Sequence, residues 1–198
     1  YLDYLPQIYN KKLNPADGYV QPYSDTPLDH ENVGENIYLN IINHAKKYVY
    51  IFTPYLIVDN EMTIALQNAA KCGIDVRIVT PDIPDKKLVF LLTQSYYEQL
   101  IQNGVRIYQY TPGFIHAKCF VCDDKVATVG TVNLDYRSLY LHFECGVFMY
   151  RSQAVMQIKQ DALDTISRSN EISLEFCKNR NIAIRAVQSV LRLFAPLM

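Results

Sequence analysis

Three short apolar segments alternate with helical patterns in the first half of the chain, and this alternation restricts the fold more than any other feature. The apolar segments, rich in β-branched and aromatic side chains, cover residues 48–53, 76–80 and 105–110. Pro54 and Pro81 end the first two, as is usual for strands. Residues 59–73 and 84–103 carry apolar side chains at helical spacing. The order strand, helix, strand, helix, strand predicts an α/β fold with a partly parallel sheet.

In the second half of the chain strands no longer alternate with helices. The pattern there predicts antiparallel strands followed by helices. Strands are expected at residues 115–121 and 125–129, joined by an Asp123-Asp124 turn, and at residues 144–150. Further helices are expected at residues 29–44, 152–169 and 181–194. The whole pattern indicates an α/β (α+β sandwich) fold, in which helices flank a central mixed β-sheet.

Composition limits the kind of partner. The 198 residues include 19 basic and 20 acidic side chains, a net charge of −1, whereas nucleic-acid binders usually show a basic excess. Five cysteines, an odd number, argue against a disulfide framework and favour a reducing setting. The longest mostly apolar stretch, residues 48–58, is shorter than the ~20 residues that span a bilayer. We therefore expect a soluble chain, and its start at Tyr1 instead of Met indicates a piece of a longer protein.

A block in the middle of the chain carries polar side chains that can take part in a reaction. His116, Lys118 and Asp123 have the spacing H-x-K-x-x-x-x-D, and Thr131 and Asn133 follow in a Gly-Thr-Val-Asn segment. In a regular strand His116 and Lys118 would share a face, whereas Asp123 would have the opposite parity. We therefore interpret Asp123 as structural within this block, fixing the turn or a neighbouring element. The hairpin should return Thr131 and Asn133 to the side of His116 and Lys118.

These side chains suit a phosphodiester. An imidazole titrates near neutrality and can attack phosphorus or protonate a leaving alkoxide, which makes His116 the reactive group. Lys118 and Asn133 can neutralise charge on the non-bridging oxygens, and Thr131 offers a hydroxyl for the same phosphate. Neither a metal nor a cofactor is required by this set.

The spacing resembles the signature of the phospholipase D superfamily, H-x-K-x-x-x-x-D followed by G-[ST]-x-N. Residues 133–139 and Phe143-Glu144 resemble bacterial cardiolipin synthases, as do residues 53–55 and 83–87. The resemblance extends from about residue 19 to the end of the chain and implies a phospholipase D-like fold. We divide the chain into a linker, residues 1–22, and a phospholipase D-like domain, residues 23–198.

The resemblance also implies how the block works. Family members carry two such motifs, one in each half, which meet at a pseudo-two-fold interface. One histidine forms a phospho-histidine and the other protonates the departing alcohol. This chain has one motif and looks like the C-terminal half, without the upstream half and its membrane helices. The family pattern gives His116 the acid/base role and gives Asp123 a place in the catalytic motif. It also makes Glu144 a carboxylate that orients an imidazole, that of the partner motif.

The implied reaction transfers a phosphatidyl group between two phosphatidylglycerol molecules, giving cardiolipin and glycerol. The expected partners are phosphatidylglycerol, an anionic membrane surface, and either the missing N-terminal half or a second copy of this domain. No nucleic acid is expected as a partner. The full-length protein is expected at the cytoplasmic face of the cell membrane. Two alternatives stay open: a phosphodiesterase of the same superfamily (lipase or nuclease) that uses water, and an inactive isolated half.

Several features have a purely structural interpretation as well as a functional one. Cys119 and Cys122 form a C-x-x-C, but on a strand their sulfurs point to opposite faces, so they are expected in the core rather than on zinc. Asp135 and Arg137 suit an ion pair that braces the loop as well as a substrate contact. The helix at residues 181–194 has basic residues on one stripe and apolar residues on the other. It is expected either to lie on an anionic membrane or to pack with a solvated basic face.

Overall fold

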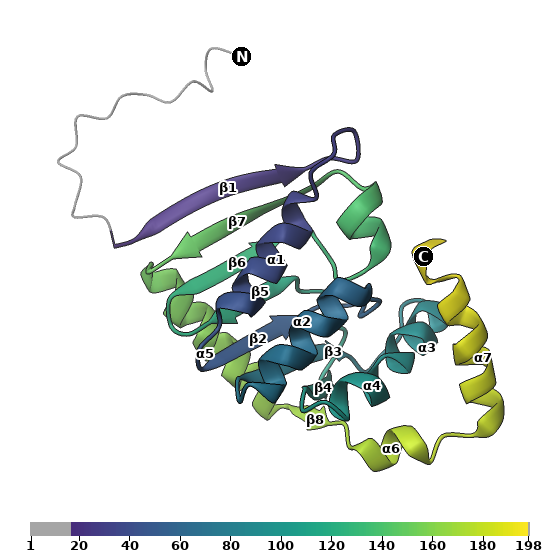
Figure 1. The fold of residues 1–198 in the computed structure, drawn as a ribbon. Helices are drawn as coiled ribbons and strands as arrows, with labels where there is room; N and C mark the ends of the chain where they lie inside the picture. Colours follow the sequence, from purple (N-terminus) through teal and green to yellow (C-terminus); the bar gives the residue numbers. More distant parts are fainter. Residues whose placement is uncertain (1–16, 198) are drawn as a thin grey trace, which may run out of the picture.

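Eight strands form one mixed sheet in the computed structural model, which describes residues 17–197 (Figure 1). Their order across the sheet is β1-β7-β6-β5-β2-β3-β4-β8. The strands are β1 (Tyr19–Asp25), β2 (Tyr48–Phe52), β3 (Asp75–Pro81), β4 (Arg106–Tyr110), β5 (Cys119–Cys122), β6 (Val126–Gly130), β7 (Glu144–Tyr150) and β8 (Ser169–Glu171). β2, β3 and β4 run parallel, while the other neighbouring pairs are antiparallel. The predicted mixed sheet is therefore confirmed.

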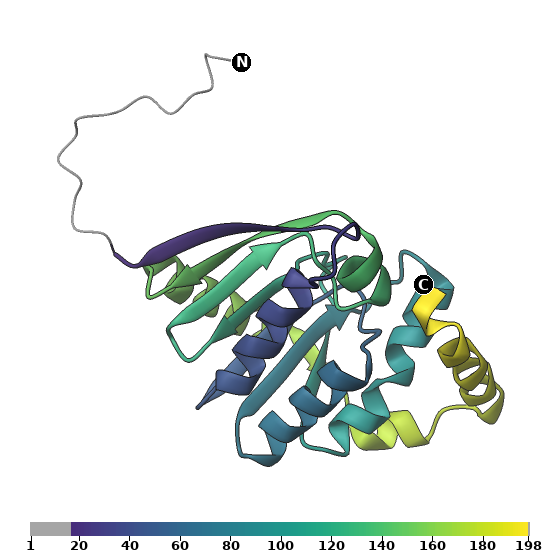
Figure 2. The ribbon, with the colours of Figure 1, turned by 45° about the horizontal axis from the view of Figure 1, so that its top comes forward.

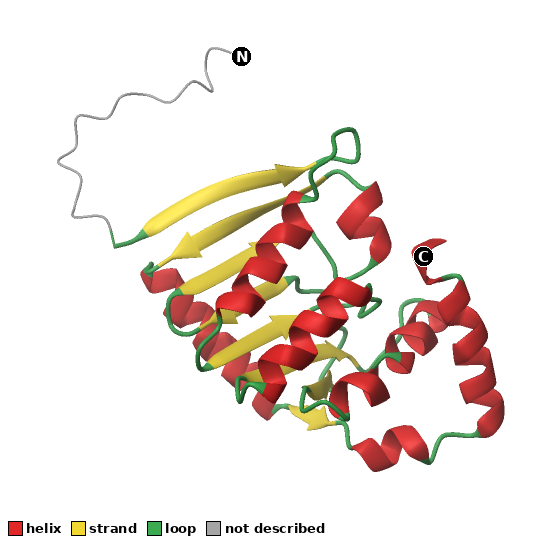
Figure 3. Cartoon of the chain, in the orientation of Figure 1, coloured by secondary structure: helices red, strands yellow, loops and turns green. Residues whose placement is uncertain are grey.

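Helices cover both faces of this sheet (Figure 3). The helices are α1 (Val33–His44), α2 (Asn60–Lys71), α3 (Lys87–Ser95), α4 (Tyr97–Ile101), α5 (Gln153–Ser167), α6 (Leu174–Lys178) and α7 (Ile182–Leu193), with a π-helical turn η2 (Arg137–Leu141) and a 3-10 turn η3 (Ala195–Leu197). α1 and α2 lie on one face and α5 lies on the other, as the rotated view makes clear (Figure 2). No helix in the described part of the chain has the length and apolarity needed to cross a membrane.

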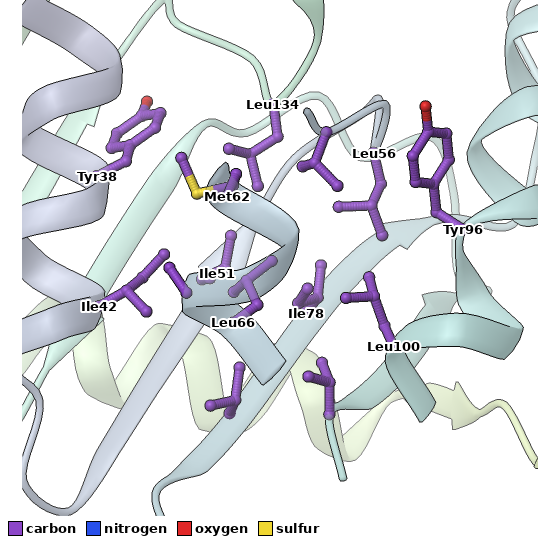
Figure 4. Packing of buried hydrophobic residues seen from close by; sticks show 14 of the residues in the cluster. Tyr38, Ile42, Ile51, Leu56, Met62, Leu66, Ile78, Tyr96, Leu100 and Leu134 are labelled. Atoms are coloured by element: carbon purple, nitrogen blue, oxygen red, sulfur yellow. The ribbon is translucent and has the colours of Figure 1, made fainter. Parts of the chain in front are cut away.

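Each face of the sheet has its own core, and β2 contributes to both. Val49 and Ile51 point into the larger core beneath α1 and α2. Tyr48, Tyr50 and Phe52 point into the smaller core beneath α5. All five side chains of β2 are buried, as expected for a strand covered by helices on both faces. Figure 4 shows the larger core, where Ile51 and Ile78 of the sheet meet Met62 and Leu66 of α2.

The cysteines of the C-x-x-C fall on opposite sides of the sheet, as their parity predicts. Cys119 packs in the core beneath α5, and Cys122 packs in the core beneath α1 and α2. Both are free thiols, and burial raises the pKa of each to about 12. These thiols therefore stay protonated at neutral pH and act as small apolar core residues.

Several element boundaries differ from the sequence-based expectations. α1 begins at Val33, not at Asp29, because the Asp29 carboxylate accepts the backbone N–H of Glu31 in a local turn. The helix expected at residues 84–103 is divided into α3 and α4. The strand expected at residues 115–121 begins only at Cys119, so His116 and Lys118 precede the strand instead of lying in it.

The N-terminal segment contributes to the sheet. Residues 1–16 of the expected linker lie outside the described residues, whereas residues 19–22 belong to β1 and pair with β7. The described part of the linker is thus strand from Tyr19 onward, and this strand continues to Asp25. β8 and α6 had no counterpart in the sequence-based expectations.

Helix α7 packs with its polar stripe inward, which neither sequence-based expectation foresaw. Gln188 donates to the carbonyl of Leu91 at 2.9 Å, and Arg192 donates to Gln99 at 2.9 Å. The opposite stripe is apolar and faces solvent, with Ile182 83% exposed and Leu193 78% exposed. In the expected packing the apolar side would be covered; here it is the uncovered side.

A buried acid cluster joins α1, α2 and η2. The Tyr140 hydroxyl lies 2.6 Å from a Glu35 oxygen and also contacts the carboxylate of Asp59. The Tyr140 hydroxyl has one proton and can donate it to only one of the two carboxylates. Glu35 and Asp59 therefore retain one proton between them. Burial, reinforced by the hydrogen bond with Asp59, raises the pKa of Glu35 to about 7.

This raised pKa predicts that the domain loses stability as the pH increases. A carboxyl with a higher pKa in the folded chain stabilises the fold only while it is protonated. The contribution is complete below its ordinary value of 4.5 and disappears as the pH rises through about 7. Glu35→Gln cannot ionise and should unfold at a higher temperature than the parent at pH 8, by about 2–4 °C for each 1 kcal/mol gained. The difference should shrink at pH 5.

Thermal unfolding at several pH values, followed by circular dichroism, measures this. Glu31→Gln, an exposed carboxylate just before α1, is the matched control and should follow the parent. If the unfolding temperatures of Glu35→Gln and the parent change with pH in the same way, the idea that Glu35 and Asp59 share a proton is contradicted.

Candidate active site

Two loops meet at the carboxyl end of β2 and form the frame of the candidate site. The Thr53 hydroxyl donates to the carbonyl of Tyr55 at 2.7 Å and accepts the backbone N–H of Leu134 at 3.0 Å. The N–H of Ile57 donates to the carbonyl of Leu134 at 2.8 Å. The segment after β2 is thereby bound to the segment after β6. In α/β sheets the carboxyl ends of the strands are where ligand sites form.

Gly130 allows the second of these segments to lie against β7. A Cβ atom at this position would come within 2.4 Å of the Cys145 carbonyl oxygen and 2.7 Å of the Gly146 Cα. Both neighbours are backbone atoms of the sheet and cannot move aside alone. The glycine of the Gly-Thr-Val-Asn segment is therefore a packing requirement.

His116 lies in an exposed, extended segment just before β5, between two aromatic rings. Phe114 stacks on the imidazole with ring centroids 5.5 Å apart, and Tyr55 meets it edge-on at 6.0 Å. Tyr55 is itself held by a hydrogen bond from its hydroxyl to Asp85, in the loop between β3 and α3. Partial burial, with the charges of Lys118 and Lys86, lowers the pKa of His116 below its usual range. The imidazole is therefore mainly neutral at pH 7.

Lys118 folds back along the chain beside His116. Its ammonium group donates to the His116 carbonyl at 2.9 Å. Burial lowers the pKa of Lys118, while the nearby carboxylates of Glu144, Asp135 and Asp85 act in the opposite direction. Three carboxylates thus act on the charge of Lys118, and this charge in turn lowers the pKa of His116.

Asn133 points to the interior of the same loop. Its amide nitrogen donates to the Ser138 hydroxyl at 3.1 Å, and the backbone N–H of Ser138 donates to Asp135 at 2.8 Å. The Asn133 side-chain oxygen is buried and has no hydrogen-bond partner among residues 17–197. A buried amide oxygen without a donor is energetically costly and is a usual mark of a site completed by a ligand or water.

A cavity of about 340 Å³ opens beside these residues. Its lining includes the side chains of Tyr55, Lys86, Asn133, Asp135, Arg137, Ser138, His142 and Leu197. His116 and Lys118 do not line it themselves, but Tyr55 lies between the cavity and the His116 ring. Arg137 makes no ion pair with Asp135 in the described part of the chain. Asp135 instead accepts from the N–H of Ser138, and Arg137 lines the cavity.

Glu144 and Thr131 are at the edge of this site. Glu144 begins β7 and lies 3.7 Å from the imidazole of His142, and its negative charge acts on Lys118. The Thr131 hydroxyl accepts the N–H of Cys145 at 3.0 Å and donates to its carbonyl at 3.2 Å. It is therefore occupied by backbone partners of β7.

Asp123 lies at the other end of β5, away from His116. Its carboxylate accepts three backbone N–H groups, from Lys46 at 2.6 Å, Lys47 at 2.8 Å and Tyr48 at 3.0 Å. Asp123 and Asp124 have φ values of 53° and 60°, the geometry of a type I′ hairpin turn. The carboxylate thus fixes the loop that leads into β2, and the described contacts agree with the structural interpretation of this residue.

Three residues near the site were not among the sequence-predicted site residues. Tyr55 and Lys86 follow the carboxyl ends of β2 and β3, and Ser138 holds Asn133. Their positions after strands of a parallel unit are a signal that could have identified the first two. Ser138 had no such signal, because its contact with Asn133 depends on the π-helical turn.

Comparisons with known proteins agree on one family. A family model described as the phospholipase D-like domain of cardiolipin synthase matches residues 38–165. An uncharacterized protein of Streptococcus mutans is 50% identical over 98% of this chain and 42% of its own length. Cardiolipin synthase of Alkalihalophilus pseudofirmus is 37% identical over 94% of this chain and 37% of its own length. The chain thus spans about two fifths of the length of these curated relatives.

Solved structures show the same fold at low sequence identity. Nuc of Salmonella typhimurium, a phospholipase D family member, superposes with a TM-score of 0.65 at 17% identity, over 78% of this chain and 97% of that one. Phosphatidylserine synthase of Haemophilus influenzae gives a TM-score of 0.68 at 17% identity, over 90% of this chain and 45% of that one. The fold therefore occurs both as a nearly whole chain and as about half of a longer one.

The role of Asp123 can be tested by stability. Asp123→Ala removes an acceptor for three N–H groups and leaves a residue at positive φ that lacks the short polar side chain by which Asp and Asn tolerate this conformation, so the free energy of unfolding should fall by about 1–3 kcal/mol. Asp123→Asn keeps one acceptor oxygen and tolerates positive φ, so it should lose less. Chemical denaturation measures both changes. The His116 ring resonance should keep its position in both variants, and a shifted His116 signal without loss of stability would contradict a purely structural role.

Proposed function

The chain belongs to the family of phospholipase D-like domains of cardiolipin synthases, and from this membership we propose that it is one catalytic half of a phosphatidyltransferase. The substrate is phosphatidylglycerol, and the products are cardiolipin and glycerol. The observation that carries the proposal is the arrangement around His116: an exposed, mainly neutral imidazole beside the Lys118 ammonium, at the carboxyl end of the central strand. Asn133, whose amide oxygen has no partner among residues 17–197, lies in the adjoining loop.

The proposed reaction consists of two displacements at phosphorus. In the first, a histidine nitrogen attacks the phosphate of one phosphatidylglycerol, and the bond from phosphorus to the glycerol oxygen breaks. In the second, a hydroxyl of another phosphatidylglycerol attacks the phosphatidyl-histidine, and the phosphorus–nitrogen bond breaks. We assign His116 the proton transfers: it gives a proton to the departing glycerol and later takes one from the attacking hydroxyl. A lowered pKa makes its imidazolium form a stronger acid for the first of these transfers.

The other polar residues have supporting roles in this proposal. Lys118 places a positive charge beside His116 and would neutralise a non-bridging phosphate oxygen. Asn133 remains a candidate for a phosphate contact through its amide nitrogen, which donates to Ser138 here. Thr131 would have to give up its hydrogen bond to the Cys145 carbonyl before it could donate to a phosphate. Glu144 remains a candidate for orienting an imidazole, and His142 at 3.7 Å is the imidazole nearest to it in the described contacts. Lys86 and Arg137, which line the cavity, add positive charge for a lipid phosphate.

We further propose that the active unit contains two such domains. The chain carries one H-x-K-x-x-x-x-D motif, and the two displacements use a nucleophile and an acid. Either another segment of the same polypeptide or a second copy of this domain could supply the second histidine. The match to about half of phosphatidylserine synthase supports the first arrangement, and the match to nearly all of Nuc supports the second.

The outward face of α7 is the proposed contact with the lipid surface. Residues 178–197 hold no acidic side chain, so this segment carries no negative charge that would repel an anionic bilayer. The apolar stripe of α7 continues into Leu197, which is 76% exposed and lines the catalytic cavity. A bilayer that covers this stripe would therefore lie at the mouth of the site. This contact differs from the one expected from the sequence, in which the arginines would face the lipid.

The reaction can be tested with the longest protein that the gene encodes. Mixed with phosphatidylglycerol vesicles and EDTA, it should form cardiolipin and glycerol in equal amounts. His116→Ala should lower the rate at least 1,000-fold because the proton transfers lose their group. His44→Ala, an exposed histidine at the end of α1, should retain the parent rate. Phosphatidic acid without cardiolipin would favour a water-using lipase, and cleavage of added DNA would favour a nuclease.

The lipid contact can be tested separately by vesicle sedimentation. Leu193→Glu places a charge on the apolar stripe at the carboxyl end of α7 and should weaken binding to phosphatidylglycerol vesicles about tenfold or more, because a buried leucine contributes ~1.5–3 kcal/mol. Leu28→Glu alters a residue that is 82% exposed, far along the chain from α7, and should bind like the parent. Equal binding of both variants would remove α7 from the lipid contact. A loss of dimer formation in Leu193→Glu alone would show that the stripe is a protein interface instead.

A further inference from the structure

A second cavity lies beneath α7, apart from the catalytic one. It has a volume of about 140 Å³ and is lined by residues of α3, α4 and α7, with Cys177 of α6 and Arg180 in the following loop. It shares no lining residue with the catalytic cavity in the part of the chain that the structure describes. The catalytic cavity takes Val89 from the first part of α3, and this one takes Gln94 and Ser95 from its end, about 8–9 Å further along the helix.

The lining is strongly positive. Arg180, Arg185 and Arg192 all contribute, and Glu98 is the acidic residue among the lining side chains. Three positive charges against one negative charge leave a formal charge of +2. A concave surface with this charge attracts anions, because low-dielectric walls concentrate the field.

Arg180, which lines this cavity, has a donor without a partner among residues 17–197. One of its terminal nitrogens donates to the side-chain oxygen of Gln94 at 2.6 Å. The other, Nη1, is buried and has no hydrogen-bond partner among residues 17–197. Leaving a charged donor buried without an acceptor costs more than leaving a neutral one, so an acceptor is required there.

The contacts that hold α7 in place use only some of the donors of these three arginines. Arg192 is accounted for, since it donates to Gln99 and its guanidinium lies 4.3 Å from the centre of the Tyr96 ring. Arg185 lies 3.7 Å from a Glu98 oxygen, beyond hydrogen-bond distance, and its side chain is 51% exposed. Arg180 and Arg185 therefore both have unused donors, and both residues line this cavity.

We propose that this cavity binds a phosphate-type oxyanion between Arg180 and Arg185. Guanidinium groups present paired N–H donors that match the oxygens of a phosphate. The cavity holds the volume of about four to five water molecules at ~30 Å³ each, enough for a phosphate group. The same chemistry is offered by free phosphate and by the headgroup of an anionic phospholipid. The proposal rests on the charges and the unused donors, and does not depend on the chemistry at His116.

NMR of the arginine side chains tests the site directly in the parent chain. The Nε–H signals of Arg180 and Arg185 are followed while sodium phosphate replaces sodium chloride at constant ionic strength. A saturable shift of both signals supports the proposal and identifies free phosphate as a sufficient ligand. If only phosphatidylglycerol vesicles perturb them, and phosphatidylcholine vesicles do not, the ligand is the lipid headgroup. No response to phosphate or to either vesicle overturns the proposal.

Matched variants distinguish specific phosphate binding in the cavity from nonspecific attraction of phosphate to surface charge. Arg180→Gln should weaken phosphate binding at least tenfold, whereas Lys178→Gln, the same charge change two residues away and outside the cavity lining, should bind like the parent. Equal weakening by both variants would overturn the proposal. Lys118→Gln should leave the Arg180 response unchanged, which distinguishes this cavity from the phosphate chemistry proposed at His116. If Arg180→Gln unfolds, the titration of the parent chain decides the question.

Discussion

The pairing of β2 with β5 is the constraint on which the rest of the molecule depends. On one side of this pair the sheet continues through the parallel strands β3 and β4, and on the other through antiparallel strands β6, β7 and β1. The pairing sets Phe52 opposite Cys119 and Val49 opposite Cys122. It therefore brings the segment before β5, with His116 and Lys118, to the carboxyl end of β2. The active-site candidate exists because two halves of the sheet join at this register.

Asp123 and Thr53 hold the two ends of this junction. Asp123 collects the three N–H groups that lead into β2, at the end away from the site. Thr53 links the loop after β2 to the segment after β6, at the end where the site lies. A slip of one residue would exchange the faces of β2, sending Ile51 and Phe52 to the wrong cores. Two residues of one signature thus lie at opposite ends of β5: Asp123 holds the loop before β2, and His116 lies at the end where the candidate site is.

Helix α7 shows how the surface of the domain departs from the usual arrangement. An amphipathic helix on a globular protein normally buries its apolar stripe. Here the polar stripe packs on α3 and α4 through Gln188 and Arg192, and the apolar stripe remains exposed. Two separate proposals follow from the two sides of the same helix: a lipid contact outside and an anion site beneath.

The sequence by itself determined the alternation of strands and helices and the hairpin at Asp123-Asp124, because these depend on local pattern and spacing. It predicted the reactive residues from the spacing of the motif, and their roles stay a prediction. Opposite placement of Cys119 and Cys122 followed from strand parity alone. The sequence did not determine that β5 starts only after Lys118, that Ser138 holds Asn133, or that α7 turns Gln188 and Arg192 inward. Those outcomes depend on partners distant in the chain: Thr53 for the loop at residues 132–135, and Gln99 with Tyr96 for Arg192. Helical periodicity shows that a helix has two sides, but only packing against its neighbours decides which side is buried.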